Sequence, residues 1–476
     1  MVTLRLVGTF LFLLLFAPLA VFAEVRPNII LMMTDDMGWG DPGYNGNTII
    51  KTPHLDAMSR SGIRFDRFYA AAPVCSPTRG SCITGRNAYR FGIHNANDGH
   101  LRAAEITLAE MLKQNGYATG HFGKWHLGTL SPDYSGKGNR RNPKANFATP
   151  GMNGFEEWFS TEFAVATWDP YDPANSHLKS DVARDSRALY WHNGVNVSEP
   201  LVGDDSRIIV DRVIPFIEQS TAADKPFFAV VWFHAPHGPV VGGPGYRAMY
   251  PEHDEDAQHY YACITALDEQ VGRIRRRLQE FGVEGNTMLW FCSDNGPEGN
   301  PGPVDRHRGT AGPFRGRKRS LYEGGIRVPG LLVWPDKISA ARTVDTPCVT
   351  SDYLPTILDA AGMEFASDRP LDGVSLLPII EGRQTNRSQA IGFELRGQSA
   401  LLDDRYKLVH NSDESRPRSD NGQTPYEEWE LYDLLSDPSE TKNIASEQPA
   451  IVSKMKMLLE DWQASCHRSA DGNDYH

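Results

Sequence analysis

The sequence predicts an α/β protein with a large mixed, mostly parallel sheet covered by helices, followed by a smaller C-terminal α+β unit with a short antiparallel sheet. Three observations indicate this fold. Short apolar runs alternate with amphipathic stretches, three of these runs end directly in polar residues, and the pattern changes near residue 368. Continuous apolar runs are typical of strands that are buried on both faces of a sheet.

The first 23 residues have the composition of a secretory signal. Arg5 precedes an almost wholly apolar run over 6–22, which ends in small residues up to Ala23. We expect cleavage after Ala23 and export to the periplasm or the extracellular space, with the lysosome or secretory pathway as the alternative. An uncleaved anchor is the less favoured interpretation of this run. No later run is long enough to span a bilayer, so we expect no stable membrane anchor.

The composition excludes two broad classes of protein. The 476 residues include 48 Lys and Arg against 60 Asp and Glu, a net charge of −12, which argues against a nucleic-acid binder. A hydrophobic content of 40% and an aromatic content of 10% are far from those of a disordered chain. The six cysteines are too few for a disulfide scaffold in a chain of this size and match no zinc-binding spacing.

The main unit is expected over residues 24–368. We predict buried strands at Asn28–Thr34, 226–233 and Thr287–Ser293, and helices at 106–115, 205–219, 257–281 and 351–361, with a kink or an early stop at Pro215. Ligands of open α/β sheets bind beyond the carboxyl ends of the strands. The polar residues after the three strands are therefore the first candidates for a functional site.

The C-terminal unit is expected over residues 369–476. We predict short strands at 390–395, 399–402, 406–410 and 430–434, a polar loop at 416–424 and a closing helix at 450–465. These elements are typical of a small α+β fold.

The segment 75–79 reads Cys-Ser-Pro-Thr-Arg, and Thr-Gly-Arg follows at 84–86. This pattern resembles the modification signature of the formylglycine-dependent sulfatases of the alkaline phosphatase superfamily, in which the cysteine is oxidised to an aldehyde. Further segments resemble that family in the same order along the chain: 26–28, 34–41, 52–56, 123–128, 293–296, Lys318 with 323–325, and 430–440. The resemblance implies an alkaline-phosphatase-like fold, formylglycine at position 75 and a formylglycine-generating enzyme as a maturation partner.

A metal site is implied by Asp35, Asp36, Asp294 and Asn295, together with the modified Cys75. The four side chains offer only oxygen ligands, which suit Ca²⁺ better than Zn²⁺, with Mg²⁺ as the alternative. Three carboxylates crowded together repel one another without a cation.

The resemblance also implies catalytic roles. The hydrated aldehyde at position 75 attacks sulfur, Arg79 and Lys124 hold the diol and the sulfate, and His126 accepts a proton when sulfate is expelled. The leaving alcohol receives its proton from His234, with Lys318 as a second candidate; Lys124, His234 and Lys318 also bind substrate. His237, in the same His-Ala-Pro-His segment, is the alternative to His234. The stretch 306–319 contains six Lys or Arg and no acid, which fits an anionic ligand.

The sequence therefore predicts a sulfatase that hydrolyses sulfate monoesters on a small molecule or, in our preferred interpretation, on a sulfated carbohydrate or polysaccharide. A phosphate or phosphonate monoester hydrolase of the same superfamily is one alternative, and an inactive protein that binds sulfated glycans is another. The aromatic segment 130–181 is a candidate for stacking on sugar rings, with core packing as the other interpretation.

Overall fold

The computed structural model describes residues 26–137, 141–175, 189–299, 306–412 and 427–475. The signal segment predicted over 1–23 and the polar loop predicted over 416–424 lie outside these ranges. In the described ranges, no helix is both long enough and apolar enough to cross a membrane.

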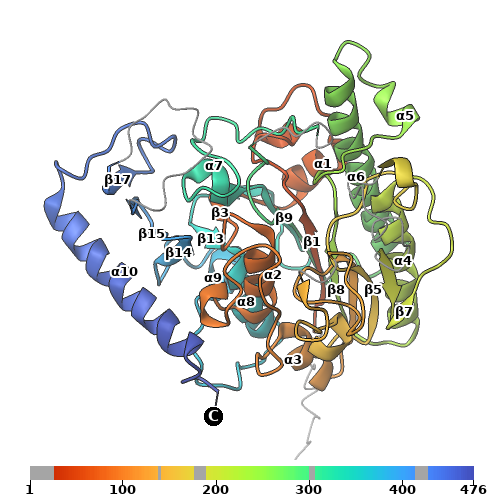
Figure 1. Ribbon diagram of the computed structural model, residues 1–476, viewed down its shortest axis with the longest axis horizontal. Helices are drawn as coiled ribbons and strands as arrows, with labels where there is room; N and C mark the ends of the chain where they lie inside the picture. The colour runs from red at the N-terminus through yellow and green to blue at the C-terminus, as the bar shows by residue number, and fades with distance from the viewer. Residues whose placement is uncertain (1–25, 138–140, 176–188, 300–305, 413–426, 476) are drawn as a thin grey trace, which may run out of the picture.

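The main sheet has, in the described part of the chain, ten strands in the order β12-β2-β11-β9-β1-β8-β4-β5-β6-β7. Of these strands, β9, β1, β8, β5 and β7 can be followed by their labels in Figure 1. Its parallel centre consists of β9 (Thr287–Ser293), β1 (Asn28–Thr34), β8 (Phe227–Trp232), β4 (Ala118–Lys124) and β5 (Glu157–Thr161). The flanking strands are β11 (Gly330–Val333), β2 (Ile63–Phe65), β12 (Arg342–Val344), β6 (Tyr190–His192) and β7 (Val195–Asn196). Antiparallel pairing of β11 with β9 and of β6 with β5 makes the sheet mixed, as predicted.

Both faces of this sheet are buried, which explains the continuous apolar runs. Along β1, Ile29 belongs to one hydrophobic core and Ile30 to the other, because successive side chains of a strand point to opposite faces. The first core contains side chains of α3 (Leu108–Gln114) and α8 (Tyr353–Ala360). The second contains side chains of α1 (Pro53–Ser61), α4 (Asp205–Ala222) and α6 (Glu255–Glu280). The predicted helix-covered sheet is thus confirmed.

The early stop predicted at Pro215 is wrong. Pro215 lies inside α4, which continues to Ala222. A proline removes one backbone donor from a helix. However, Ile209, Val213 and Ile217 are buried on both sides of it and pack in the second core. This packing maintains the helix through the proline.

Shorter elements complete the main unit. The helices are α2 (Cys75–Thr84), α5 (Pro244–Arg247), α7 (Glu323–Ile326) and α9 (Leu377–Ile380), with 3-10 turns at Gly43–Asn45, Ala88–Arg90, Pro150–Asn153, Pro173–Asn175 and Thr350–Asp352. A small sheet is formed by β10 (Arg327–Val328), β3 (Phe68–Tyr69) and β13 (Cys348–Val349).

The predicted C-terminal α+β fold is also confirmed. An antiparallel sheet contains β14 (Ile391–Leu395), β15 (Gln398–Leu402), β16 (Tyr406–His410) and β17 (Trp429–Asp433), and α10 (Pro449–Ala470) follows. In Figure 1 this helix runs along the outer side of the sheet, far from α4 and α6. One core joins the sheet to Leu321 and Tyr322 of the main unit, and another joins it to α10. The boundary at residue 368 stays a prediction.

Candidate active site

The carboxyl ends of four neighbouring strands meet at one edge of the main sheet. Because β9, β1, β8 and β4 are parallel and adjacent, the residues that follow them are brought together. The side chains placed there are Asp35 and Asp36 after β1, Asp294 and Asn295 after β9, Lys124 at the end of β4, and His234 and His237 after β8.

Hydrogen bonds connect the two acidic segments. Asp36 has a φ of 67°, an uncommon backbone conformation for a residue other than glycine, and its N–H donates to Asp294 Oδ1 (3.2 Å). Asn295 Nδ2 donates to Asp36 Oδ1 (2.7 Å). Asp35 and these three side chains are almost completely buried.

Cys75 is the first residue of α2, and Arg79 lies one turn further along the helix. Arg79 donates to Asp294 Oδ2 through Nε (3.1 Å) and Nη2 (2.6 Å), and to the carbonyl of Lys124 (3.2 Å). The four-residue spacing of the motif places Cys75 and Arg79 on the same side of the helix. Arg79 is fully buried and does not line the pocket described below. It contacts the carboxylate of Asp294, whereas the sequence predicted that it holds the diol and the sulfate.

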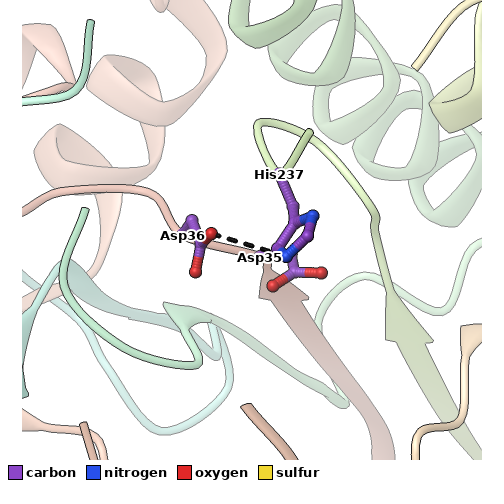
Figure 2. Close-up of side chains that lie close together, drawn as sticks. All are labelled: Asp35, Asp36 and His237. Atoms are coloured by element: carbon purple, nitrogen blue, oxygen red, sulfur yellow. Dashed lines mark ion pairs between the residues drawn. The ribbon is translucent and has the colours of Figure 1, made fainter. Parts of the chain in front are cut away.

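The acidic cluster fits a divalent cation. Ligand atoms of Asp35, Cys75 and Asp294 lie within 4.8 Å of one another, as do those of Asp35, Asp36 and His237. Figure 2 shows Asp35 and Asp36 at the end of β1, facing His237 on the loop after β8. Among the described residues, the buried Oδ1 atoms of Asp35 and Asn295 have no hydrogen-bond partner. Such atoms are costly to bury, and oxygen ligands satisfy Ca²⁺ or Mg²⁺.

Two lysines contact the cluster. Lys124 Nζ lies 2.5 Å from Asp35 Oδ2, and Lys318 Nζ lies 2.6 Å from Asp36 Oδ1. Burial by itself raises the pKa of Asp36, but Lys318 and His237 hold this pKa well below its usual range. Burial and the neighbouring charge of Asp35 raise the pKa of Asp294 to about 6, although Arg79 opposes this effect.

A pocket of about 390 Å³ opens over these groups. Its inner wall is formed by Cys75, Lys124, His126, His237 and Lys318. Burial, assisted by the charge of Lys124, lowers the pKa of His126 well below its usual range. The Nε2 atom of His126 lies 3.0 Å from Asn97 Oδ1.

The structure does not bring His234 into this pocket. His234 is fully buried, with Nδ1 2.6 Å from Asp205 Oδ2 and Nε2 2.7 Å from Thr161 Oγ1, so both ring nitrogens are occupied. The N–H of His237 donates to the carbonyl of His234 (2.8 Å), and the resulting turn separates the two rings. It is His237 that lines the pocket, and burial lowers its pKa well below the usual range although Asp36 opposes this.

Most of the basic stretch 306–319 binds protein groups. Arg306 and Arg308 form ion pairs with Asp256 near the start of α6, and Arg317 donates to the carbonyl of Glu298. Of this stretch, Lys318 and Arg319 line the pocket. The predicted role in binding an anionic ligand therefore applies to Lys318 and Arg319.

The aromatic segment 130–181 divides in a similar way. Phe163 and Tyr171 line the pocket, whereas Phe155, Trp158 and Phe159 are buried in the two cores. Stacking on a sugar ring is thus open to the first two residues.

Comparisons with known proteins identify the family of the chain. A family model described as Sulfatase matches residues 27–363, and one described as N-sulphoglucosamine sulphohydrolase, C-terminal, matches residues 312–465. The chain therefore belongs to the sulfatase family and is a sulfuric ester hydrolase.

Individual relatives cover most of the chain. It is 34% identical to N-acetylgalactosamine-6-sulfatase of Sus scrofa over 384 residues, which is 77% of this chain and 68% of that protein. It is 32% identical to arylsulfatase G of Rattus norvegicus over 389 residues, or 75% and 69% of the two chains. The solved structure of Ps i-CgsB in complex with k-i-k-neocarrahexaose has a TM-score of 0.76 and 25% identity, covering 92% of this chain and 93% of that chain.

Sequence reasoning missed several residues of the pocket wall. Asn97, Lys137 and Arg396 line the pocket but come from loops and a hairpin turn without a recognisable motif. Arg319, by contrast, belongs to the basic stretch 306–319, for which the sequence predicted an anionic ligand.

Proposed function

We propose that this sulfatase hydrolyses sulfate monoesters on a sulfated carbohydrate, with residue 75 as formylglycine. The observation that carries the proposal is the position of Cys75, which is buried at the start of α2, within 4.8 Å of ligand atoms of Asp35 and Asp294, and lines a pocket together with Lys124 and Lys318. The similarity to N-acetylgalactosamine-6-sulfatase and to a protein solved with neocarrahexaose supports a glycan substrate.

Asp35, Asp36, Asp294 and Asn295, together with modified residue 75, would hold Ca²⁺, with Mg²⁺ as the alternative. The formylglycine hydrate would supply the hydroxyl that attacks sulfur, and a bound cation would supply the positive charge that lowers the pKa of this hydroxyl. Arg79 keeps Asp294 ionised and in place through its two hydrogen bonds. Its role is therefore to position a ligand.

The remaining side chains bind the sulfate and move protons. Lys124 and Lys318 lie on the inner wall of the pocket and would hold the sulfate oxygens as negative charge develops. His237 would donate a proton to the oxygen of the leaving alcohol, in place of His234, from the imidazolium form that the negative charge of the bound sulfate favours. His126 would accept the proton released when sulfate is expelled and the aldehyde is restored.

The proposal includes the biosynthetic route of the enzyme. Modification of Cys75 requires a formylglycine-generating enzyme, and the segment 1–23 would direct export to the periplasm or the extracellular space, with the lysosome or secretory pathway as the alternative. We assign residues 24–368 to the catalytic unit and residues 369–476 to the C-terminal unit.

Mass spectrometry of the peptide that contains Cys75 tests the proposal. Protein co-expressed with a formylglycine-generating enzyme is expected to carry the aldehyde at this position and to release sulfate from sulfated sugars, while Cys75→Ala folds but releases none. An unmodified thiol in that protein, combined with full activity of Cys75→Ala, would contradict the assignment.

A further inference from the structure

Two cations of the outer pocket wall have no part in the chemistry proposed above. Lys137 is exposed on the loop after β4, and Arg396 is exposed at the turn between β14 and β15 of the C-terminal sheet. The pocket is therefore built by both units of the chain, although the residues expected to carry the chemistry belong to the main unit.

The turn that presents Arg396 is conformationally unusual. Leu395 pairs with Gln398, so Arg396 and Gly397 form a two-residue hairpin turn with φ values of 49° and 81°. Positive φ at both positions strongly favours Asn-Gly or Gly-Gly, and a long side chain at the first position is disfavoured. A residue in a sparsely populated conformation at a binding site suggests a function for its side chain.

The other lysines and arginines of the pocket have acidic partners. Lys124 and Lys318 pair with Asp35 and Asp36, and Arg319 makes a two-pronged ion pair with Glu298. Lys137 and Arg396 form no ion pair with any acid of the described residues; Lys137 Nζ lies 4.4 Å from the ring centre of Phe163. The acid that lines this pocket in the described part of the chain is Asp172, whose Oδ1 accepts from the N–H of Ala174.

We propose that Arg396, assisted by Lys137, binds a second anionic group of the substrate, either a sulfate or a carboxylate, on the sugar that carries the scissile sulfate or on its neighbour. This inference rests on the proposed function and narrows it. The substrate class becomes a multiply anionic sulfated glycan, and the C-terminal sheet supplies a specificity-determining residue.

The test compares three sugars that share a 6-sulfate. N-acetylgalactosamine 6-sulfate has one anionic group, N-acetylgalactosamine 4,6-disulfate adds a sulfate, and the disaccharide glucuronyl-N-acetylgalactosamine 6-sulfate adds a carboxylate. Each is assayed for sulfate release by the calcium-loaded enzyme, and for binding to Cys75→Ala protein by calorimetry. The second and third sugars distinguish the two sources of the extra charge.

Arg396→Asn is the informative variant because asparagine suits the turn and lacks the charge. We expect unchanged or higher thermal stability and about a tenfold loss of affinity for the sugar, or sugars, with a second anion, since a charge-assisted hydrogen bond is removed. Affinity for the singly charged sugar should change less than about twofold, and Lys137→Gln should show the same selectivity. The matched control is Arg405→Asn, in the next hairpin of the same sheet, because Arg405 pairs with Asp433 and does not line the pocket.

The inference is overturned if Arg396→Asn binds each of the three sugars as tightly as the parent protein does. It is also overturned if the variant loses affinity for all three sugars by the same factor. Failure of the proposed function gives a different result. In that case the parent releases no sulfate from any of the sugars, yet a charge-selective loss of binding in Arg396→Asn still supports the second anion site.

Discussion

The ring of His237 lies beside the acidic cluster, with Nε2 3.7 Å from Asp36 Oδ2. His234, three residues earlier, instead contacts Asp205 and Thr161 inside the protein. We predict that His237→Asn lowers kcat by about 10²–10⁴-fold, because a general acid contributes this much when it protonates a leaving group. Sulfate release from a sugar substrate, measured beside the thermal unfolding temperature, checks this expectation.

His234→Asn provides the contrast. It removes one of the two side chains that contact the buried Asp205 carboxylate, the other being Tyr190, so we expect a loss of about 1–3 kcal/mol in the free energy of unfolding. His237→Asn should therefore fold normally with a kcat lowered about 10²–10⁴-fold, whereas His234→Asn should be destabilised. A fully active His237→Asn enzyme would refute the assignment.

The contrast between these histidines shows where sequence reasoning ends. Both stand after a recognisable strand in His-Ala-Pro-His, and from this segment His237 lines the pocket. Which ring enters the pocket depends on the turn that links His237 N–H to the carbonyl of His234, and on partners from distant segments. Neither is visible in the spacing of residues.

Strand prediction had a similar limit. β1, β8 and β9 were recognisable because their residues are almost uninterruptedly apolar. The run Ala-Thr-Gly-His-Phe-Gly-Lys of β4 is interrupted by glycine, histidine and lysine, yet it is a central strand that ends at Lys124. His121 is accommodated because its Nδ1 lies 2.8 Å from Ser160 Oγ on the neighbouring strand β5. Tertiary contacts determine whether such a run forms a strand, and these contacts cannot be read from a single sequence.

Arg79 provides a prediction about calcium and stability. Arg79→Gln leaves Asp294 buried without its cationic partner, which is expected to cost about 3–5 kcal/mol of unfolding free energy in the ion-free protein. Calcium should restore part of this stability, because it supplies positive charge to the same carboxylate. Thermal unfolding with and without Ca²⁺ should thus show a larger calcium effect in the variant than in the parent.

Arg277→Gln is the matched control for that experiment. Arg277 forms an exposed ion pair with Glu280 on α6, and such pairs contribute about 0–1 kcal/mol. An Arg79→Gln protein with parental stability and an unchanged calcium response would show that the contact to Asp294 is dispensable.

The raised pKa of Asp294 predicts how calcium affects the pH profile. In the ion-free protein this carboxyl group has a pKa of about 6, so it is protonated at lower pH and ionised at higher pH. A cation must displace that proton, and its affinity therefore falls as the pH drops below 6. The acid limb of kcat/KM should move to lower pH by at most about one unit for each tenfold increase in Ca²⁺, the limit for one competing proton. An acid limb that does not respond to calcium would exclude this competition.

Lys407 joins the C-terminal sheet to the catalytic unit. Its Nζ lies 3.0 Å from Glu323 Oε1 and 2.8 Å from Glu440 Oε1, and all three side chains are buried. Burial alone raises the pKa of Glu323, yet Lys407 and Arg327 keep this pKa below its usual value, so Glu323 is a carboxylate at neutral pH.

Lys407→Ala leaves that charge without its closest cation, and we expect a loss of about 3–5 kcal/mol in the free energy of unfolding, measured with urea at pH 7. Lys442→Ala, which removes an exposed pair with Glu447, should cost less than about 1 kcal/mol. A Lys407→Ala protein with the stability of the parent would contradict this prediction.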